Sequence, residues 1–112
     1  MDHTTHISDQ EKKALADLAR RLRARLPVTR IILFGSKVTG SADEESDIDL
    51  LILVADSVTS DLRRLVVNET FECNLKFGVN ISSLVIEDKE WREGPPSILP
   101  FHEEVEELGV EL

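Results

Sequence analysis

The sequence has only one cysteine, Cys73, among its 112 residues. An internal disulfide is therefore excluded, as is a metal cluster built from several thiols, so a reducing compartment is the simpler expectation. The chain also lacks an apolar run of about 18 residues, the shortest that typically spans a membrane. Its opening segment, MDHTTHISDQ, lacks the basic region and apolar stretch of a secretory signal. We therefore expect a cytoplasmic protein with no membrane partner.

Basic residues are also scarce, because 13 Lys and Arg oppose 22 Asp and Glu and leave a net charge of −9. Proteins that track a long nucleic acid usually present a basic surface, since neutralising phosphates dominates their affinity. Six of the basic residues lie on one N-terminal segment: Lys12, Lys13, Arg20, Arg21, Arg23 and Arg25. Extended nucleic-acid binding is therefore not expected, although a local basic patch could meet an RNA end or an acidic partner.

Apolar residues make up 41% of the chain and recur throughout it, which predicts a folded domain. A chain of this length can bury one modest core. We therefore expect a single domain over residues 1–112, with a core over about residues 8–92. A C-terminal loop and short helix should follow over residues 93–112.

Helical and extended patterns alternate along the chain. Apolar residues at helical spacing, with an S-x-x-E capping box at Ser8 and Glu11, predict helices over residues 8–26, 57–77 and 101–108. Short apolar segments rich in β-branched residues predict strands over residues 30–34, 46–54 and 79–86. The polar segment 37–45 should form a turn or short helix, too short for a crossover, so the first two strands should be antiparallel. The expected fold class is α/β in the broad α+β sense, a small mixed sheet with packed helices.

Asp47 and Asp49 lie two residues apart on the predicted second strand. Because side chains alternate across a strand, both carboxylates should share one face, while Ile48 and Leu50 point into the core. Adjacent carboxylates repel each other unless a cation lies between them, and Mg²⁺ binds such oxygens together with phosphate oxygens. The pair therefore predicts a metal site that could clamp a phosphoryl group. A solvent-capped acidic hairpin is the alternative, but it does not explain two acids on one face of an otherwise buried strand.

Gly35 and Ser36 follow the predicted first strand directly. A glycine at this point lets the backbone approach a ligand closely, and N–H groups at the start of a helical turn bind anions. A phosphate held by Gly35 and Ser36 would lie close to a metal held by Asp47 and Asp49, because the short connecting segment brings both motifs to one end of the strands.

These motifs together resemble a known signature. Gly35-Ser36, ten further residues and Asp47-Ile48-Asp49 are similar to the G-S-x10-D-x-D pattern of the DNA polymerase β-like nucleotidyltransferase superfamily. The apolar strand before Gly35, Gly40 in the turn and the segment SDIDLL also fit, and the order of elements is similar over about residues 29–86. The chain looks like the minimal nucleotidyltransferases, which are small prokaryotic domains.

The resemblance implies transfer of a nucleotide, most simply AMP from ATP, to a hydroxyl of a protein, an RNA end or a small molecule. Another nucleoside triphosphate could replace ATP. Asp47 and Asp49 would be catalytic and would bind Mg²⁺, or Mn²⁺ in its place, while Gly35 and Ser36 would hold the triphosphate and Lys37 could meet a phosphate. The metal would neutralise charge on the transferred phosphorus and the leaving pyrophosphate.

The chain departs from the family pattern at one place. Fully active members usually carry a third carboxylate on a later strand, but residues 79–84 contain no acid, and Asn80 or Ser82 occupies the expected position. Glu72, Glu87 or Asp88 could supply an acid instead, by reaching into the site.

This departure supports an alternative, a catalytically weakened binding module. Many minimal nucleotidyltransferases resemble this chain and act as antitoxins beside a HEPN-type ribonuclease toxin. A homodimer or such a helical partner protein would complete the acceptor side.

The remaining notable side chains favour structural roles. We expect Trp91 to anchor the core or an interface, Cys73 to be buried and unreactive, and His102 to lie on the surface. His3 and His6 belong to the N-terminal segment and should bind no metal. A solvated acidic face is expected from Glu103, Glu104, Glu106 and Glu107.

Overall fold

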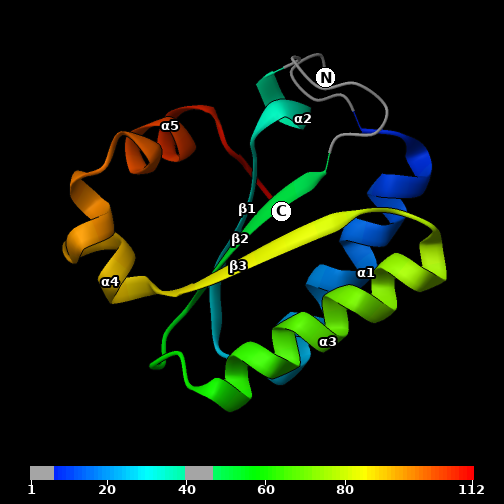
Figure 1. Cartoon of the computed structure of the whole chain (residues 1–112), viewed down its shortest axis with the longest axis horizontal. Coiled ribbons are helices and arrows are strands. Elements are labelled where there is room, and N and C mark those ends of the chain that lie inside the picture. The colour runs from blue at the N-terminus through cyan, green and yellow to red at the C-terminus, as the bar shows by residue number, and fades with distance from the viewer. Residues whose placement is uncertain (1–6, 40–46) are drawn as a thin grey trace.

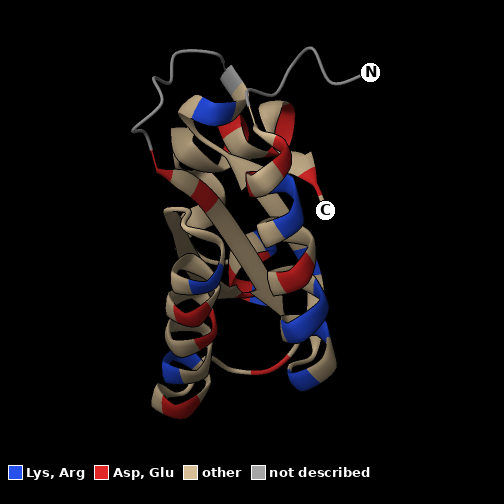
Figure 2. Ribbon diagram, turned by 90° about the vertical axis from the view of Figure 1, so that its right-hand side faces the viewer, with Lys and Arg blue, Asp and Glu red and all other residues tan. Residues whose placement is uncertain are grey.

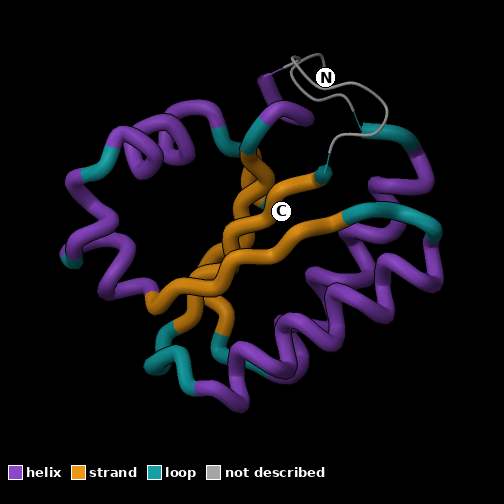
Figure 3. The backbone as a smooth tube through the Cα atoms, in the orientation of Figure 1, coloured by secondary structure: helices purple, strands orange, loops and turns teal. Residues whose placement is uncertain are grey.

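The computed structural model describes residues 7–39 and 47–112. A four-stranded sheet in the order β3-β2-β1-β4 lies between two helical layers (Figures 1 and 3). Helices α1 (Asp9–Arg25) and α3 (Ser60–Phe77) cover one face, and α4 (Asp88–Glu93) with α5 (Pro100–Leu108) cover the other. This mixed, helix-covered sheet confirms the expected fold class. His3, His6, Gly40 and Ser46 lie outside the described residues.

Helix α1 begins as the sequence predicts. The Ser8 side chain accepts a hydrogen bond from the Glu11 backbone N–H, and the Glu11 carboxylate accepts one from the Ser8 backbone N–H, so the capping box is complete. Helix α1 buries one apolar stripe against the sheet, consisting of Ala14, Leu15, Leu18, Ala19 and Leu22. Pro27 follows the helix and leads into β1 (Val28–Phe34).

Strands β1 and β2 (Ile48–Val54) are antiparallel, which confirms the expectation drawn from the short connection between them. Their register pairs Phe34, the last residue of β1, with Asp49, the second residue of β2. The carboxyl end of one strand is thereby joined to the amino end of the next. Both predicted motifs come from these two strand ends.

Helix α3 carries the chain back from β2 so that β3 (Ile81–Glu87) pairs with β2 in parallel. It ends at Gly78, whose φ of 66° is the left-handed conformation typical of a glycine C-cap. Further back along α3, Glu69 is 8% exposed. Its carboxylate forms an ion pair with Arg25 of α1, with a distance of 2.6 Å between nitrogen and oxygen. Part of the N-terminal basic cluster therefore links two helices of the same chain.

The second face holds a smaller core around Trp91, which is fully buried as expected. Ile32, Leu51, Leu53 and Val105 complete this core beneath α4 and α5. A short 3₁₀ segment, η1 (Pro95–Ile98), connects the two helices where the sequence predicted a loop. A strand that the sequence did not reveal, β4 (Val110–Glu111), then pairs antiparallel with β1.

Arg30 links this C-terminal region to β1 by charge. Its guanidinium donates to both carboxylate oxygens of Glu106, at 2.9 and 3.0 Å, and its Nε donates to Glu111 at 2.8 Å. The indole N–H of Trp91 donates to the same Glu106 at 2.6 Å, and the ring of half-buried His102 lies 4.4 Å from the Trp91 ring. The side chains of His102 and Glu106 thus stay partly exposed, at 21% and 32%, while both also contact Trp91.

Among the described residues, none of the helices combines the length and the apolar character needed to cross a membrane.

Candidate functional site

The bend after β1 depends on Gly35. Its φ is 87°, a left-handed conformation that side-chain-bearing residues rarely adopt. A Cβ placed on Gly35 would lie 3.2 Å from Cγ of Asp49 and closer still to its Oδ2. The backbone of the bend and the Asp49 carboxylate are therefore in direct contact, which only a residue without a side chain permits.

The bend continues into the single helical turn α2 (Ser36–Thr39). Ser36 is half-buried at the start of this turn, and the Val38 N–H donates to the Gly35 carbonyl at 3.0 Å. Ser36 thus lies beside Gly35 at the same end of the sheet as Asp49. The structure brings together these three residues of the predicted site.

Asp49 occupies the centre of this sheet end. It is opposite Phe34 on β1 and opposite Ser82 on β3, and its side chain is half-buried. Burial raises the pKa of the Asp49 carboxyl, and the negative charge of Asp47 raises it further. The two acids are therefore close enough to repel each other, and a cation between them would relieve that repulsion.

Asp47 directly precedes β2 and is exposed. Its Oδ1 accepts a hydrogen bond from the side-chain amide of Asn80, and the Ile48 N–H donates to the Asn80 backbone carbonyl at 2.9 Å. Asn80 is thus attached both to the strand and to the carboxylate. The sequence named Asn80 as a possible substitute for the third acid, but the structure shows that its amide holds Asp47.

The acid side chains that could have completed the site lie elsewhere. Glu87 is opposite Val54 at the far end of β2, and Asp88 accepts hydrogen bonds from Thr29 and Arg92, at 3.1 and 2.8 Å. Glu72 lines a hollow between α1 and α3. Across residues 7–39 and 47–112, no three His, Cys, Asp or Glu side chains gather as a metal-binding group.

The residue that neighbours Asp49 on β3 is Ser82, an exposed side chain. Residues paired in a parallel ladder project to the same face of the sheet. Ser82 therefore occupies the position on β3 from which a third carboxylate would lie beside Asp49. A hydroxyl supplies a neutral oxygen and no charge. Among the described residues, the carboxylates at this sheet end are Asp47 and Asp49. Such a pair suits a hard divalent ion that also takes water and phosphate oxygens.

Lys37 differs from the other predicted site residues in its surroundings. It is 4% exposed, and its ammonium lies 3.5 Å from Glu11 at the start of α1. In this conformation Lys37 ties α2 to α1. Its contact with a phosphate stays a prediction that requires this ion pair to open.

Comparison with known proteins gives a consistent set of similarities. A family model described as "Nucleotidyltransferase domain" matches residues 15–106. A protein of Methanocaldococcus jannaschii named "Putative protein adenylyltransferase" is 34% identical over 101 residues, which cover 90% of this chain and 93% of that protein.

Two solved toxin–antitoxin structures share the fold. One, which contains AMP-PNP, aligns with a TM-score of 0.60 and 19% identity, covering 93% of this chain and 72% of the matched chain. The other, MntA-HepT, aligns with a TM-score of 0.56 and 18% identity, covering 89% and 69% of the two chains. At these identities the similarity establishes the architecture.

Proposed function

Because the chain belongs to the nucleotidyltransferase domain family, we propose that it transfers AMP from ATP to a hydroxyl group with the help of a divalent cation, Mg²⁺ or Mn²⁺. The observation that carries the proposal is the contact of the Asp49 carboxylate with the Gly35 bend. A phosphate binding at that bend and a cation binding at Asp49 would share one small space. The register of the sheet supports this, because it pairs Asp49 with Phe34, the residue just before the bend.

In this proposal each residue has a distinct task. Asp47 and Asp49 hold the cation, and the Asn80 amide orients Asp47. The backbone of Gly35 and Ser36 holds the triphosphate, because a glycine bend admits phosphate oxygens that a side chain would exclude. The bound cation supplies charge neutralisation at the transferred phosphorus and the leaving pyrophosphate, which is the main requirement of such reactions.

A protein hydroxyl is the acceptor that we favour over an RNA end or a small molecule. The support comes from the name of the 34% identical relative, which describes a protein adenylyltransferase. The net charge of −9 also argues against affinity for long RNA.

Transfer of labelled AMP tests this function directly. The chain is incubated with ATP labelled in the α-phosphate, with Mg²⁺ or EDTA, and with proteins from a cell extract as acceptors. We expect metal-dependent labelling of a protein that disappears in Asp49→Asn and persists in Asp56→Asn, a matched control at an exposed acid beyond the far end of β2. Labelling that survives in Asp49→Asn, or an absence of AMP transfer by the wild type with every acceptor, would refute the proposal.

A second function, masking a partner toxin of the HEPN type, is favoured by Ser82. Without a carboxylate at this position the chain can hold nucleotide yet transfer it slowly, and the structures of similar fold come from toxin–antitoxin complexes. Co-expression with a candidate toxin separates the two functions. If Asp49→Asn still protects cells, the chain neutralises by binding, whereas loss of protection together with loss of labelling indicates neutralisation by modification.

A further inference from the structure

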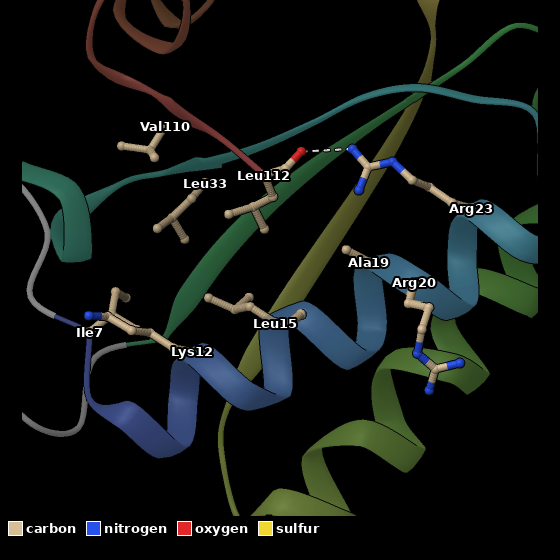
Figure 4. Close-up of a pocket in the computed structure, with 10 residues that line it drawn as sticks. Ile7, Lys12, Leu15, Ala19, Arg20, Arg23, Leu33, Val110 and Leu112 are labelled. Atoms are coloured by element: carbon tan, nitrogen blue, oxygen red, sulfur yellow. Dashed lines mark hydrogen bonds between the residues drawn. The ribbon is translucent and has the colours of Figure 1, made fainter. Parts of the chain in front are cut away.

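A groove of about 510 Å³ lies between α1 and the edge of the sheet (Figure 4). Leu15, Ala19 and Leu33 form its apolar floor, while Val110 and Leu112 of the C-terminal segment form one wall. The groove has the size of a site that accepts a small apolar segment.

The charge of the groove opposes that of the whole chain. Although the chain carries nine excess negative charges, the charged side chains that line the groove within the described part of the chain are all basic, namely Lys12, Arg20 and Arg23. Arg23 donates to the Leu112 carbonyl at 2.7 Å, and Arg20, with a side chain 70% exposed, pairs with Asp17 at 2.5 Å. These contacts hold the two guanidinium groups at the rim. An occupant should therefore be apolar in its centre and acidic at its edge.

The same chain presents such a surface on α5 and the residues before it. Ile98, Leu99 and Leu108 are 84%, 51% and 50% exposed. Beside them lie three exposed acids that form no ion pair with any part of the chain that the structure describes: Glu103, Glu104 and Glu107. We call this set the acidic α5 face. It is apolar and negative where the groove is apolar and positive.

The topology allows both contacts to form at once. Strand β4 is the edge of the sheet, α1 lies on one face of the sheet and α5 on the other (Figure 1). A two-fold axis parallel to the strands beside β4 exchanges the two faces, so the groove of each copy meets the acidic α5 face of its partner. We propose that the chain forms a symmetric homodimer in which each α1 groove holds the partner's acidic α5 face.

Local complementarity is necessary for such a dimer, because two chains of charge −9 otherwise repel each other. Helices α1 and α3 both carry residues of each sign (Figure 2), whereas the charged side chains that the structure describes in the groove lining are Lys12, Arg20 and Arg23. Glu104 and Leu108 of the acidic α5 face border a small pocket beside Gly35. The charge changes that test the pairing are therefore confined to groove and face residues that do not line this pocket, so that dimerisation and nucleotide transfer can be measured separately.

Charge exchange between two variants tests the pairing. The groove variant carries Arg20→Glu with Arg23→Glu, and the face variant carries Glu103→Arg with Glu107→Arg. By sedimentation equilibrium at micromolar concentration we expect a wild-type dimer and, for each variant alone, a dissociation constant raised at least about tenfold by like charges. Mixing the two variants should restore the dimer, because each groove then faces an α5 surface of opposite charge.

A matched control changes the same charge elsewhere. Arg63→Glu with Arg64→Glu on the exposed side of α3 should leave the dimer intact. A monomeric wild type would overturn the proposal, and so would a mixture of the groove and face variants that stays monomeric while both remain folded by circular dichroism. Dissociation of the α3 control to the same extent would also overturn it, since net charge rather than the groove would then decide assembly.

Discussion

Replacing Gly35 by alanine tests the contact on which the proposed site depends. The new Cβ would lie 3.2 Å from Cγ of Asp49 and 3.4 Å from its Cβ, with Oδ2 closer than either. Backbone surrounds Asp49 on both sides, on β1 and on β3, so its carboxylate has to rotate away from the bend. The substitution would therefore change the geometry of the proposed metal site while keeping both carboxylates.

Two separate effects follow from this substitution. The left-handed φ of 87° costs a residue with a Cβ about 1–2 kcal/mol of folding stability. Displacement of a metal ligand should lower the affinity for Mg²⁺-ATP by about 10- to 100-fold, the usual consequence of disturbing the groups that orient a ligand. The first effect is general for such a conformation, and the second is specific to the site.

Gly78→Ala supplies the matched control. Gly78 also has a left-handed φ, 66°, but its Cβ would meet only Gln10 Nε2 at 3.4 Å, an ordinary contact. Urea denaturation should show similar losses of stability for both variants, whereas calorimetric titration with Mg²⁺-ATP should show a loss of affinity only for Gly35→Ala. Wild-type affinity in folded Gly35→Ala would refute the metal and phosphate assignment, and an equal loss in both variants would attribute the effect to stability.

Three further predictions concern other parts of the chain. Ser82→Asp should place a third carboxylate beside Asp49, lowering stability without metal and raising both Mn²⁺ affinity and AMP transfer; unchanged metal binding by calorimetry would contradict this register argument. Hydrogen bonds from Arg30 hold the pKa of the Glu106 carboxyl below its usual value. Their contribution to the stability of the folded state is therefore present at neutral pH and is lost as the pH falls through that lowered pKa. Arg30→Met should cost about 1–2 kcal/mol at pH 7 and less under acid conditions in urea titrations, and a cost independent of pH would contradict the pairing. Burial raises the pKa of the Cys73 thiol, which is 3% exposed, so iodoacetamide should label it slowly in the native protein and rapidly in urea, as mass spectrometry would show.

The sequence predicted the proximity of the strand ends well because that arrangement depends on local information. The residues between the two predicted strands, 35–45, are few for a crossover helix, which favours antiparallel pairing, and antiparallel pairing joins the end of β1 to the start of β2. The capping box at Ser8 and Glu11 is equally local, since it depends on three residues of spacing. Local patterns of this kind specify their geometry without contacts from distant parts of the chain.

Other features depend on contacts between distant parts of the chain. Strand β4 is only two residues long, and nothing in its composition distinguishes Val110 from a residue of an irregular tail until β1 supplies hydrogen bonds. The bond from Asn80 to Asp47 joins residues 33 positions apart. Arg30 and Glu106 are separated by 76 positions, so no periodicity in the sequence could show that the acidic helix α5 supplies an ion-pair partner to β1.

The position of Ser82 bears on how the proposed reaction would proceed. Phosphoryl-type transfer depends mostly on positioning and on neutralising charge, and only secondarily on removing a proton from the acceptor. In the proposed site the Gly35 bend would supply the positioning, and a cation held by the two acids would neutralise the charge. A serine in register with Asp49 affects mainly that second requirement. The proton of the acceptor hydroxyl would then pass to water or to a group carried by the acceptor itself. Acceptor choice consequently becomes part of catalysis: a protein that presents its hydroxyl beside its own acid would be modified faster by this chain than one that does not.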